Sequence, residues 1–212
     1  MKHTLRSGFT LIELMVTMGI VTVIMSIVLF SYSRFNDRLA LTTAAQELAI
    51  TIRQAQSYGL NVKESGVGNG QFTSAYGIYF NPPHAASAYA GDPTHYVLFV
   101  DNQTVNKTYN SGSGTCGSSS TECVEIVTLR NGVTISAVCD GAGECPPTRG
   151  SGGTRALSIT FLRPNPDADI NFINAGGNIL LGGEPTGKVV LKSPQGNTIM
   201  VVVEKTGQIS IQ

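Results

Sequence analysis

The chain has 212 residues with 14 basic and 14 acidic side chains, so its formal net charge is zero. This balance lacks the basic excess with which proteins neutralise nucleic-acid phosphates, and the length suits one globular domain with one further element. Three scattered histidines and four cysteines, none of them in a closely spaced ligand pair, give little support for a metal site.

A short basic leader precedes a long apolar segment at the N-terminus. Lys2 and Arg6 come before Gly8, and Glu13 is the only charged residue from Phe9 to Phe30. About 20 apolar residues let a helix cross a membrane, whereas a carboxylate within such a helix costs about 2.5–3.5 kcal/mol. The basic flank predicts that the N-terminus faces the cytoplasm and that the rest of the chain is exported.

The position of Gly8 distinguishes this leader from an ordinary secretory signal. In such signals the apolar stretch lies before the cleavage site, so it is lost from the mature protein. A cut after Gly8 would keep the apolar helix in the mature chain. It would also remove Lys2 and Arg6, which leaves 12 basic against 14 acidic residues and a net charge near −2.

The motif Gly8–Val16, GFTLIELMV, resembles the start of the type IV pilin and pseudopilin superfamily. The resemblance implies that prepilin peptidase cuts after Gly8 and N-methylates the new N-terminus at Phe9. It also implies that Glu13 pairs with the N-terminal amine of a neighbouring subunit during assembly. A carboxylate and an ammonium are each costly in a dry bundle and compensate one another there. The alternative is a single-pass anchor in which Glu13 has no role.

The helix is expected to continue beyond the membrane, because no proline occurs before Pro82 and an apolar stripe follows. A helix from Phe9 to about Leu60 would be about 78 Å long at 1.5 Å per residue. Segment Leu48–Ser57 is similar to a helix signature of the GspH/FimT pseudopilins. Phe30 stands where major pilins usually have a helix-kinking proline, which favours a minor subunit or a pseudopilin. The stripe, with steps of four and three, consists of Leu41, Ala45, Leu48, Ile52, Ala55 and Gly59.

Short β-branched and aromatic runs predict a β-rich second part of the chain. Asn131-Gly132 is a strong hairpin signal between two of these runs, and Lys205–Gly207 is expected to turn the last pair. The fold class is therefore α+β, with a long N-terminal helix packed on an antiparallel sheet or small β-sandwich. The predicted strands are Ala75–Phe80, His95–Asp101, Cys123–Leu129, Val133–Val138, Ala156–Phe161, Lys188–Lys192, Ile199–Val203 and Gln208–Ile211.

Four segments follow from these patterns: a leader (1–8), a transmembrane or assembly helix (9–30), its amphipathic continuation (31–65) and a globular β-rich domain (66–212). Three polar stretches within the last segment predict loops. They are either extra loop length that the surface of the domain tolerates, or a variable outer face that contacts a partner. These stretches are Tyr89–Thr94, Asn102–Glu122 and Asp140–Gly153.

The four cysteines, Cys116, Cys123, Cys139 and Cys145, are expected to form disulfides, because an exported domain lies in an oxidising compartment. Local bridges, Cys116 with Cys123 and Cys139 with Cys145, are the simplest pairing. Bridges between the two loops remain the alternative, because four cysteines allow three connectivities. We expect no free thiol in the mature protein.

No catalytic residue, cofactor or metal is predicted. His84 and His95 lack a nucleophile partner by motif, and Ser33, Ser57 and Ser65 lie in no nucleophile elbow. The acidic residues Asp140, Glu144, Asp167 and Asp169 could be read as a cluster. Segment Asp167–Asp169, however, lacks the glycine and distal glutamate of a calcium loop, which favours a solvated loop.

Nucleic acid is the alternative partner, because some FimT-type minor pilins bind DNA in natural transformation. Such binding needs clustered cations. Three lysines that could contact DNA are spread over separate strands: Lys188, Lys192 and Lys205. The only loose cluster of basic residues consists of Arg149, Arg155 and Arg163.

The sequence therefore predicts a structural subunit and not an enzyme: a minor pilin or GspH-like pseudopilin of a type IV pilus or type II secretion filament. Its expected partners are prepilin peptidase, the inner-membrane assembly platform and other pilin or pseudopilin subunits. It would be a single-pass inner-membrane protein before assembly and part of a periplasmic or cell-surface filament afterwards. The alternative is a membrane-tethered extracytoplasmic binding module for DNA or a surface glycan, and an enzyme is a distant third.

Overall fold

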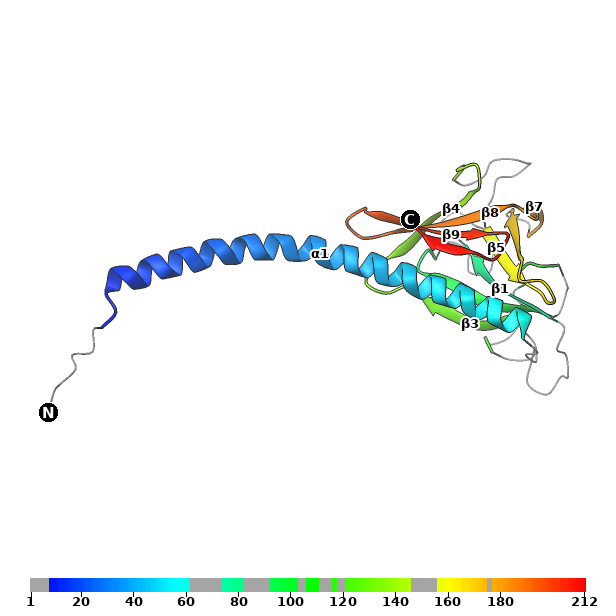
Figure 1. Ribbon diagram of the computed structural model, residues 1–212, viewed down its shortest axis with the longest axis horizontal. Coiled ribbons are helices and arrows are strands. Elements are labelled where there is room, and N and C mark those ends of the chain that lie inside the picture. The colour runs from blue at the N-terminus through cyan, green and yellow to red at the C-terminus, as the bar shows by residue number, and fades with distance from the viewer. Residues whose placement is uncertain are drawn as a thin grey trace.

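The computed structural model describes residues 8–61, 74–81, 92–102, 106–110, 116–117, 121–145, 156–174 and 177–212. A single helix, α1 (Leu11–Leu60), leads into a domain with two antiparallel sheets, which confirms the predicted α+β fold (Figure 1). Several sequence-based candidates lie outside the described residues: the leader before Gly8, Ser65, His84, Arg149 and Arg155.

The strands of the domain are β1 (Ala75–Phe80), β2 (His95–Asp101), β3 (Cys123–Thr128), β4 (Thr134–Asp140), β5 (Ala156–Phe161), β6 (Ala168–Ile173), β7 (Ile179–Leu181), β8 (Thr186–Lys192), β9 (Thr198–Glu204) and β10 (Ile209–Ile211). One sheet has the order β3-β2-β1-β5-β6-β7 and the other the order β10-β9-β8-β4. The eight predicted strands coincide with observed ones to within two residues at each end.

Local chemistry fixes both ends of α1. Thr10 has an extended backbone and its Oγ1 accepts the backbone N–H of Glu13 at 3.3 Å, as in the first half of a capping box. At the other end Asn61 returns to an extended conformation, and its N–H donates to the Ser57 carbonyl at 3.0 Å. Between these residues the helix runs 50 residues without interruption, and its first half projects away from the sheets (Figure 1).

The apolar stripe on the second half of α1 forms one core with both sheets. Ile78 and Phe80 of β1 belong to this core, as do Val201 and Val203 of β9. A buried hydrogen bond of 3.1 Å joins the hydroxyls of Thr51 and Tyr96, and burial raises the pKa of Tyr96 to about 12. The stripe residues in the core are Leu41, Ala44, Ala45, Leu48, Ile52 and Ala55, all at most 4% exposed.

The six-stranded sheet is also covered on its opposite face. Tyr79 and Phe99 form part of a second apolar cluster there, and the ring of Tyr109 packs on both at centroid distances of 5.5 and 5.7 Å. Residues 106–110 and 116–117, from the predicted loop Asn102–Glu122, therefore include part of this cover. Burial on both faces explains why β1, β2 and β5 read as continuous apolar runs.

The turn at Asn131-Gly132 forms, but the hairpin predicted around it does not. Both residues have positive φ (57° and 73°), and the Val133 N–H donates to the Arg130 carbonyl at 3.1 Å. The strands on either side then diverge, because β3 pairs with β2 in one sheet and β4 pairs with β8 in the other. The turn thus connects two sheets, and the predicted pairing of its flanking strands is wrong.

Two strands, β6 and β7, were not predicted from the sequence. Ala168 and Asp169 lie in β6, so the interpretation of Asp167–Asp169 as a solvated loop is wrong for two of its three residues. Along β6, Ala168, Ile170 and Phe172 enter the core, while Asp169 lies between them in the alternation. This alternation is a strand signal, but two prolines immediately upstream made a loop the simpler reading.

Gly59 provides a test of how the end of α1 packs on β5. A Cβ at this position would lie 2.3 Å from the backbone carbonyl oxygen of Phe161. We expect Gly59→Ala to destabilise the domain by about 2 kcal/mol, because this overpacking outweighs the gain of about 1 kcal/mol in helix propensity. Thermal unfolding of both variants measures the effect. Gly19→Ala is the control, because a Cβ there would meet no atom within 4 Å, and its domain should melt like the wild type.

Candidate assembly helix and its junction with the domain

The first half of α1 presents apolar side chains on all sides. It is the one helix in the described part of the chain that is long and apolar enough to cross a membrane, and none of its most apolar stretch is buried. Phe9 and Leu11 are both 77% exposed. An apolar surface of this extent is stable only in lipid or against other protein. This half of the helix is therefore a surface that lipid or another protein must cover.

The hydroxyl groups in this segment are satisfied within the helix. Thr22 and Ser26 donate to carbonyls four residues earlier at 2.8 and 2.9 Å, and Thr17 donates to Leu14 O at 2.9 Å. The Glu13 carboxylate differs, because no group among the described residues pairs with it. Glu13 is therefore the charged group in this segment whose side chain has no partner in the part of the chain that the structure describes.

Gly8 and Phe9 lie immediately before the first helical turn. A Cβ at Gly8 would meet no atom within 4 Å, and both residues are exposed. The structure therefore places the predicted cleavage and methylation positions on open backbone, next to the capped helix that contains Glu13. Their roles in processing remain predictions from the motif.

A carboxylate near the middle of the helix contacts the globular domain. Asp37 is 7% exposed and accepts three hydrogen bonds from the turn between β8 and β9. Ser193 Oγ donates at 2.6 Å, Asn197 Nδ2 at 2.8 Å and the Gln195 backbone N–H at 3.4 Å. We call Asp37 with Ser193, Gln195 and Asn197 the junction clasp.

Further contacts hold the turn of the junction clasp against α1. Gln195 Nε2 donates to Ser33 Oγ at 2.8 Å, one helical turn before Asp37. Within the turn the Ser193 N–H donates to the Asn197 carbonyl at 2.9 Å, and Ser193 Oγ also accepts the Asn197 N–H at 3.1 Å. The turn is therefore a closed unit that contacts the helix at two successive turns.

Sequence reasoning missed the junction clasp, although one signal was present. Asp37 lies four residues before Leu41, so it continues the buried stripe of α1 with a charged residue. A carboxylate in line with a core face indicates a specific partner. Its partners are about 156 residues away in the chain, so no local pattern could identify them.

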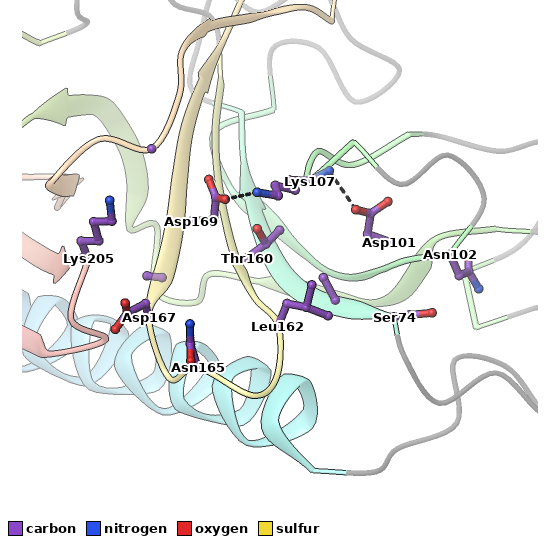
Figure 2. Close-up of a pocket in the computed structure, with 13 residues that line it drawn as sticks. Ser74, Asp101, Asn102, Lys107, Thr160, Leu162, Asn165, Asp167, Asp169 and Lys205 are labelled. Carbon is purple, nitrogen blue, oxygen red and sulfur yellow. Dashed lines mark hydrogen bonds and ion pairs between the residues drawn. The ribbon is translucent and has the colours of Figure 1, made fainter.

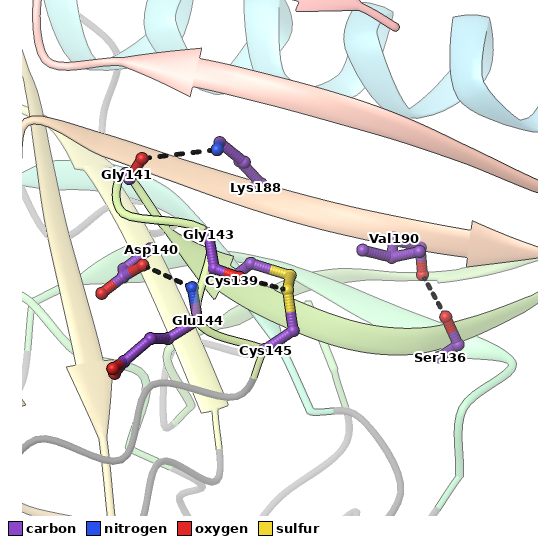
Figure 3. The surroundings of a disulfide bond; sticks show 9 residues. All are labelled: Ser136, Cys139, Asp140, Gly141, Gly143, Glu144, Cys145, Lys188 and Val190. Atoms are coloured by element: carbon purple, nitrogen blue, oxygen red, sulfur yellow. Dashed lines mark hydrogen bonds between the residues drawn. A yellow bond between two sulfur atoms is a disulfide. The ribbon is translucent and has the colours of Figure 1, made fainter.

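The disulfides have the local pairing, with Cys116 bonded to Cys123 and Cys139 bonded to Cys145. The second bridge closes a short loop at the end of β4 (Figure 3). Within that loop Asp140 Oδ1 accepts the Glu144 N–H at 2.9 Å. Asp140 is thus occupied in shaping a turn, and all four cysteines are bonded.

The other sequence-based candidates lie in different parts of the domain: Asp140 at the end of β4 with Glu144 in the loop that follows, and Asp167, Asp169 and Lys205 around one pocket. His95 Nδ1 lies 2.9 Å from an Asp92 oxygen and 3.0 Å from the Thr94 hydroxyl, so both contacts use the same ring nitrogen. In the described ranges no three His, Cys, Asp or Glu side chains come close enough to hold a metal ion. Lys188 and Lys192 lie on the same strand, β8, so the expectation of separate strands is wrong for this pair. Lys205 lies in the turn after β9.

The junction clasp gives a pH-dependent prediction. Hydrogen bonds from Ser193 and Asn197 lower the pKa of Asp37 below its usual range, against a smaller opposing effect of burial. The ionised clasp therefore stabilises the fold above the unfolded-state pKa near 3.9, and this contribution is lost as pH falls through the lower folded-state value.

Asp37→Asn should lower the melting temperature at pH 7, and the difference from wild type should shrink steadily below about pH 4. Melting curves from pH 7 to pH 3 measure this effect, with the exposed Asp167→Asn as the control. A difference between the wild type and Asp37→Asn that stays constant down to pH 3 would contradict the prediction.

Comparison with known families supports the interpretation of the N-terminal segment. Residues 4–29 match the family model described as the prokaryotic N-terminal methylation motif. No curated protein and no solved structure matches the chain. The matched region includes Gly8, Phe9 and Glu13 and most of the exposed apolar half of α1. This match supports the type IV pilin family and indicates a type IV pilin-like substrate of prepilin peptidase. The apolar N-terminal helix fits a membrane anchor.

Proposed function

We propose that this chain is a minor pilin or GspH-like pseudopilin, a structural subunit of a type IV pilus or type II secretion filament. In this function prepilin peptidase cuts after Gly8 and methylates Phe9, and the subunit waits in the inner membrane as a single-pass protein. The assembly platform then moves it into a periplasmic or cell-surface filament. The function is assembly and not catalysis.

The observation that carries this proposal is the exposed apolar half of α1 with the carboxylate of Glu13, which has no partner among the described residues. In a bundle of such helices the apolar surfaces bury one another. The N-terminal amine that cleavage creates at Phe9 is then the natural partner for the Glu13 carboxylate of a neighbouring subunit. Gly19 supports close approach, because a side chain there would meet no atom of its own chain within 4 Å.

Two features support a minor subunit of the GspH/FimT kind. The backbone of α1 continues through position 30 as regular helix, where major pilins usually have a kinking proline. Leu48, Ile52 and Ala55, from the segment similar to the GspH/FimT signature, are fully buried against the sheets. These features agree with a subunit whose second helical half is a fixed part of the globular domain.

Replacing Glu13 tests the assembly role. We expect Glu13→Ala to leave cleavage and membrane insertion intact and to reduce incorporation into filaments at least tenfold. The physical reason is that the neighbouring amine would be left unpaired in a dry bundle. Quantitative immunoblots of sheared filaments against total membranes measure the ratio. Glu47→Ala, which removes a carboxylate from the second half of the same helix, should incorporate normally, and normal incorporation of Glu13→Ala would contradict the assembly role.

Replacing Gly8 tests processing separately. Gly8→Leu should block cleavage, because a bulky side chain would occupy the position before the scissile bond that is now open. Full-length protein starting at the leader should then accumulate in the membrane, as mass spectrometry of the N-terminal peptide would show. Gly8→Ala is the small-residue control and should retain part of the processing. Normal cleavage of Gly8→Leu would rule out this position as the cleavage site.

A further inference from the structure

A pocket of about 550 Å³ opens at the end of the six-stranded sheet, close to where α1 ends (Figure 2). Its wall includes Ala75 of β1, Asp101 of β2 and Thr160 of β5, together with Lys107. The volume is in the range of small-molecule binding sites. The pocket is far along α1 from the apolar half, so the assembly helix does not use it.

Lys107, which lines one side of this pocket, has an unusual backbone conformation. Lys107 has φ of 60°, which is rare for a residue with a side chain. Three contacts fix it: its N–H donates to Asp101 Oδ2 at 2.8 Å, its carbonyl accepts Ser158 Oγ at 3.1 Å, and its Nζ pairs with Asp169 Oδ2 at 2.5 Å. Strained residues that several neighbours hold in place are frequent at binding sites.

The pocket wall includes Thr160, a residue with little exposed surface. Thr160 is 2% exposed, and its methyl group lies against β1, where a Cβ on Gly77 would come within 2.7 Å of it. No group in the described parts of the chain hydrogen-bonds to the Thr160 hydroxyl. The hydroxyl oxygen is not one of the enclosed unpaired atoms among the described residues of the domain, so it reaches the pocket, where it can bond to water or to a ligand.

The charges around the pocket indicate the kind of ligand. Lys107 neutralises Asp169, while Asp167 and Lys205 are exposed and form no ion pair among the described residues. With Asp101 the lining has three carboxylates against two ammonium groups, an excess that opposes a polyanion and is too small to select a polycation. A ligand hydroxyl can donate a hydrogen bond to a carboxylate and accept one from an ammonium, so it can bond to both kinds of group in the wall.

The position of the pocket argues against an extended peptide. Peptides commonly bind by adding a strand to an exposed sheet edge. This pocket instead crosses the ends of β1, β5 and β6, which are interior strands of the sheet. Ala75 and the 42%-exposed Leu162 add apolar surface suited to the C–H face of a ring.

From this lining we infer that the pocket binds a neutral, hydroxyl-rich ligand of the carbohydrate class. The Thr160 hydroxyl bonds a ligand hydroxyl in the floor, Asp167 and Lys205 bond others at the rim, and Leu162 contacts the ring. The inference is independent of the filament function, because the residues involved lie outside the assembly helix.

The test uses the processed full-length protein in a detergent without a sugar headgroup. An array of neutral and acidic oligosaccharides identifies a ligand, and isothermal titration calorimetry with that oligosaccharide measures affinity. We expect binding to a neutral oligosaccharide, and about a fivefold loss for Thr160→Val, since one hydrogen bond contributes about 1 kcal/mol. Thr198→Val, an exposed threonine of β9, is the matched control and should bind like wild type.

Melting temperatures separate a lost contact from a lost fold. Asp167→Asn at the exposed rim provides a second variant if Thr160→Val is unstable, and it too should weaken binding. No binding to any neutral oligosaccharide, binding to acidic ones only, or equal affinity of wild type and both variants would overturn the inference. Filament incorporation of Thr160→Val should remain normal, so this result does not depend on the assembly tests.

Discussion

The burial of the apolar stripe of α1 between the two sheets is the interaction on which the rest of the structure depends. Leu48 and Ile52 have no exposed surface, and they join the inner faces of both sheets into one core. Without the helix each sheet would expose an apolar face. The first half of the same helix, however, is not buried. Only the second half of α1 together with the domain therefore forms a structure that is stable on its own. The other part requires lipid or neighbouring helices.

How much of this arrangement the sequence predicts depends on the range of the signal. The stripe at steps of three and four, and the eight strands with alternating or β-branched residues, are local patterns and were confirmed. The turn at Asn131-Gly132 was also predicted, but its flanking strands belong to different sheets. A turn motif specifies the backbone of four residues, whereas strand pairing depends on which distant strands, β2 and β8, are available. Strand β6 was missed because upstream prolines concealed its alternation.

The candidate sites divide in the same way. Gly8, Phe9 and Glu13 stand in one short motif, so sequence was sufficient to identify them. The junction clasp joins Asp37 to residues in the turn at 193–197, and the pocket joins ends of strands from across the domain. Each of these residues is ordinary in its local context. Only the folded chain shows that Asp37 has three donors or that the Thr160 hydroxyl has no partner among the described groups.

The chemistry of the junction clasp suits its position at the boundary between the two halves of α1. An apolar contact at this point would merge with the exposed apolar surface of the first half, including Phe35 and Leu39, and would fix no particular register. A carboxylate that accepts hydrogen bonds from Ser193 and Asn197 is satisfied in only one arrangement. Hydrogen bonds to an ionised group are also stronger than neutral ones. The clasp therefore fixes the direction in which the apolar half leaves the domain, and in a helical filament that direction determines where each domain faces.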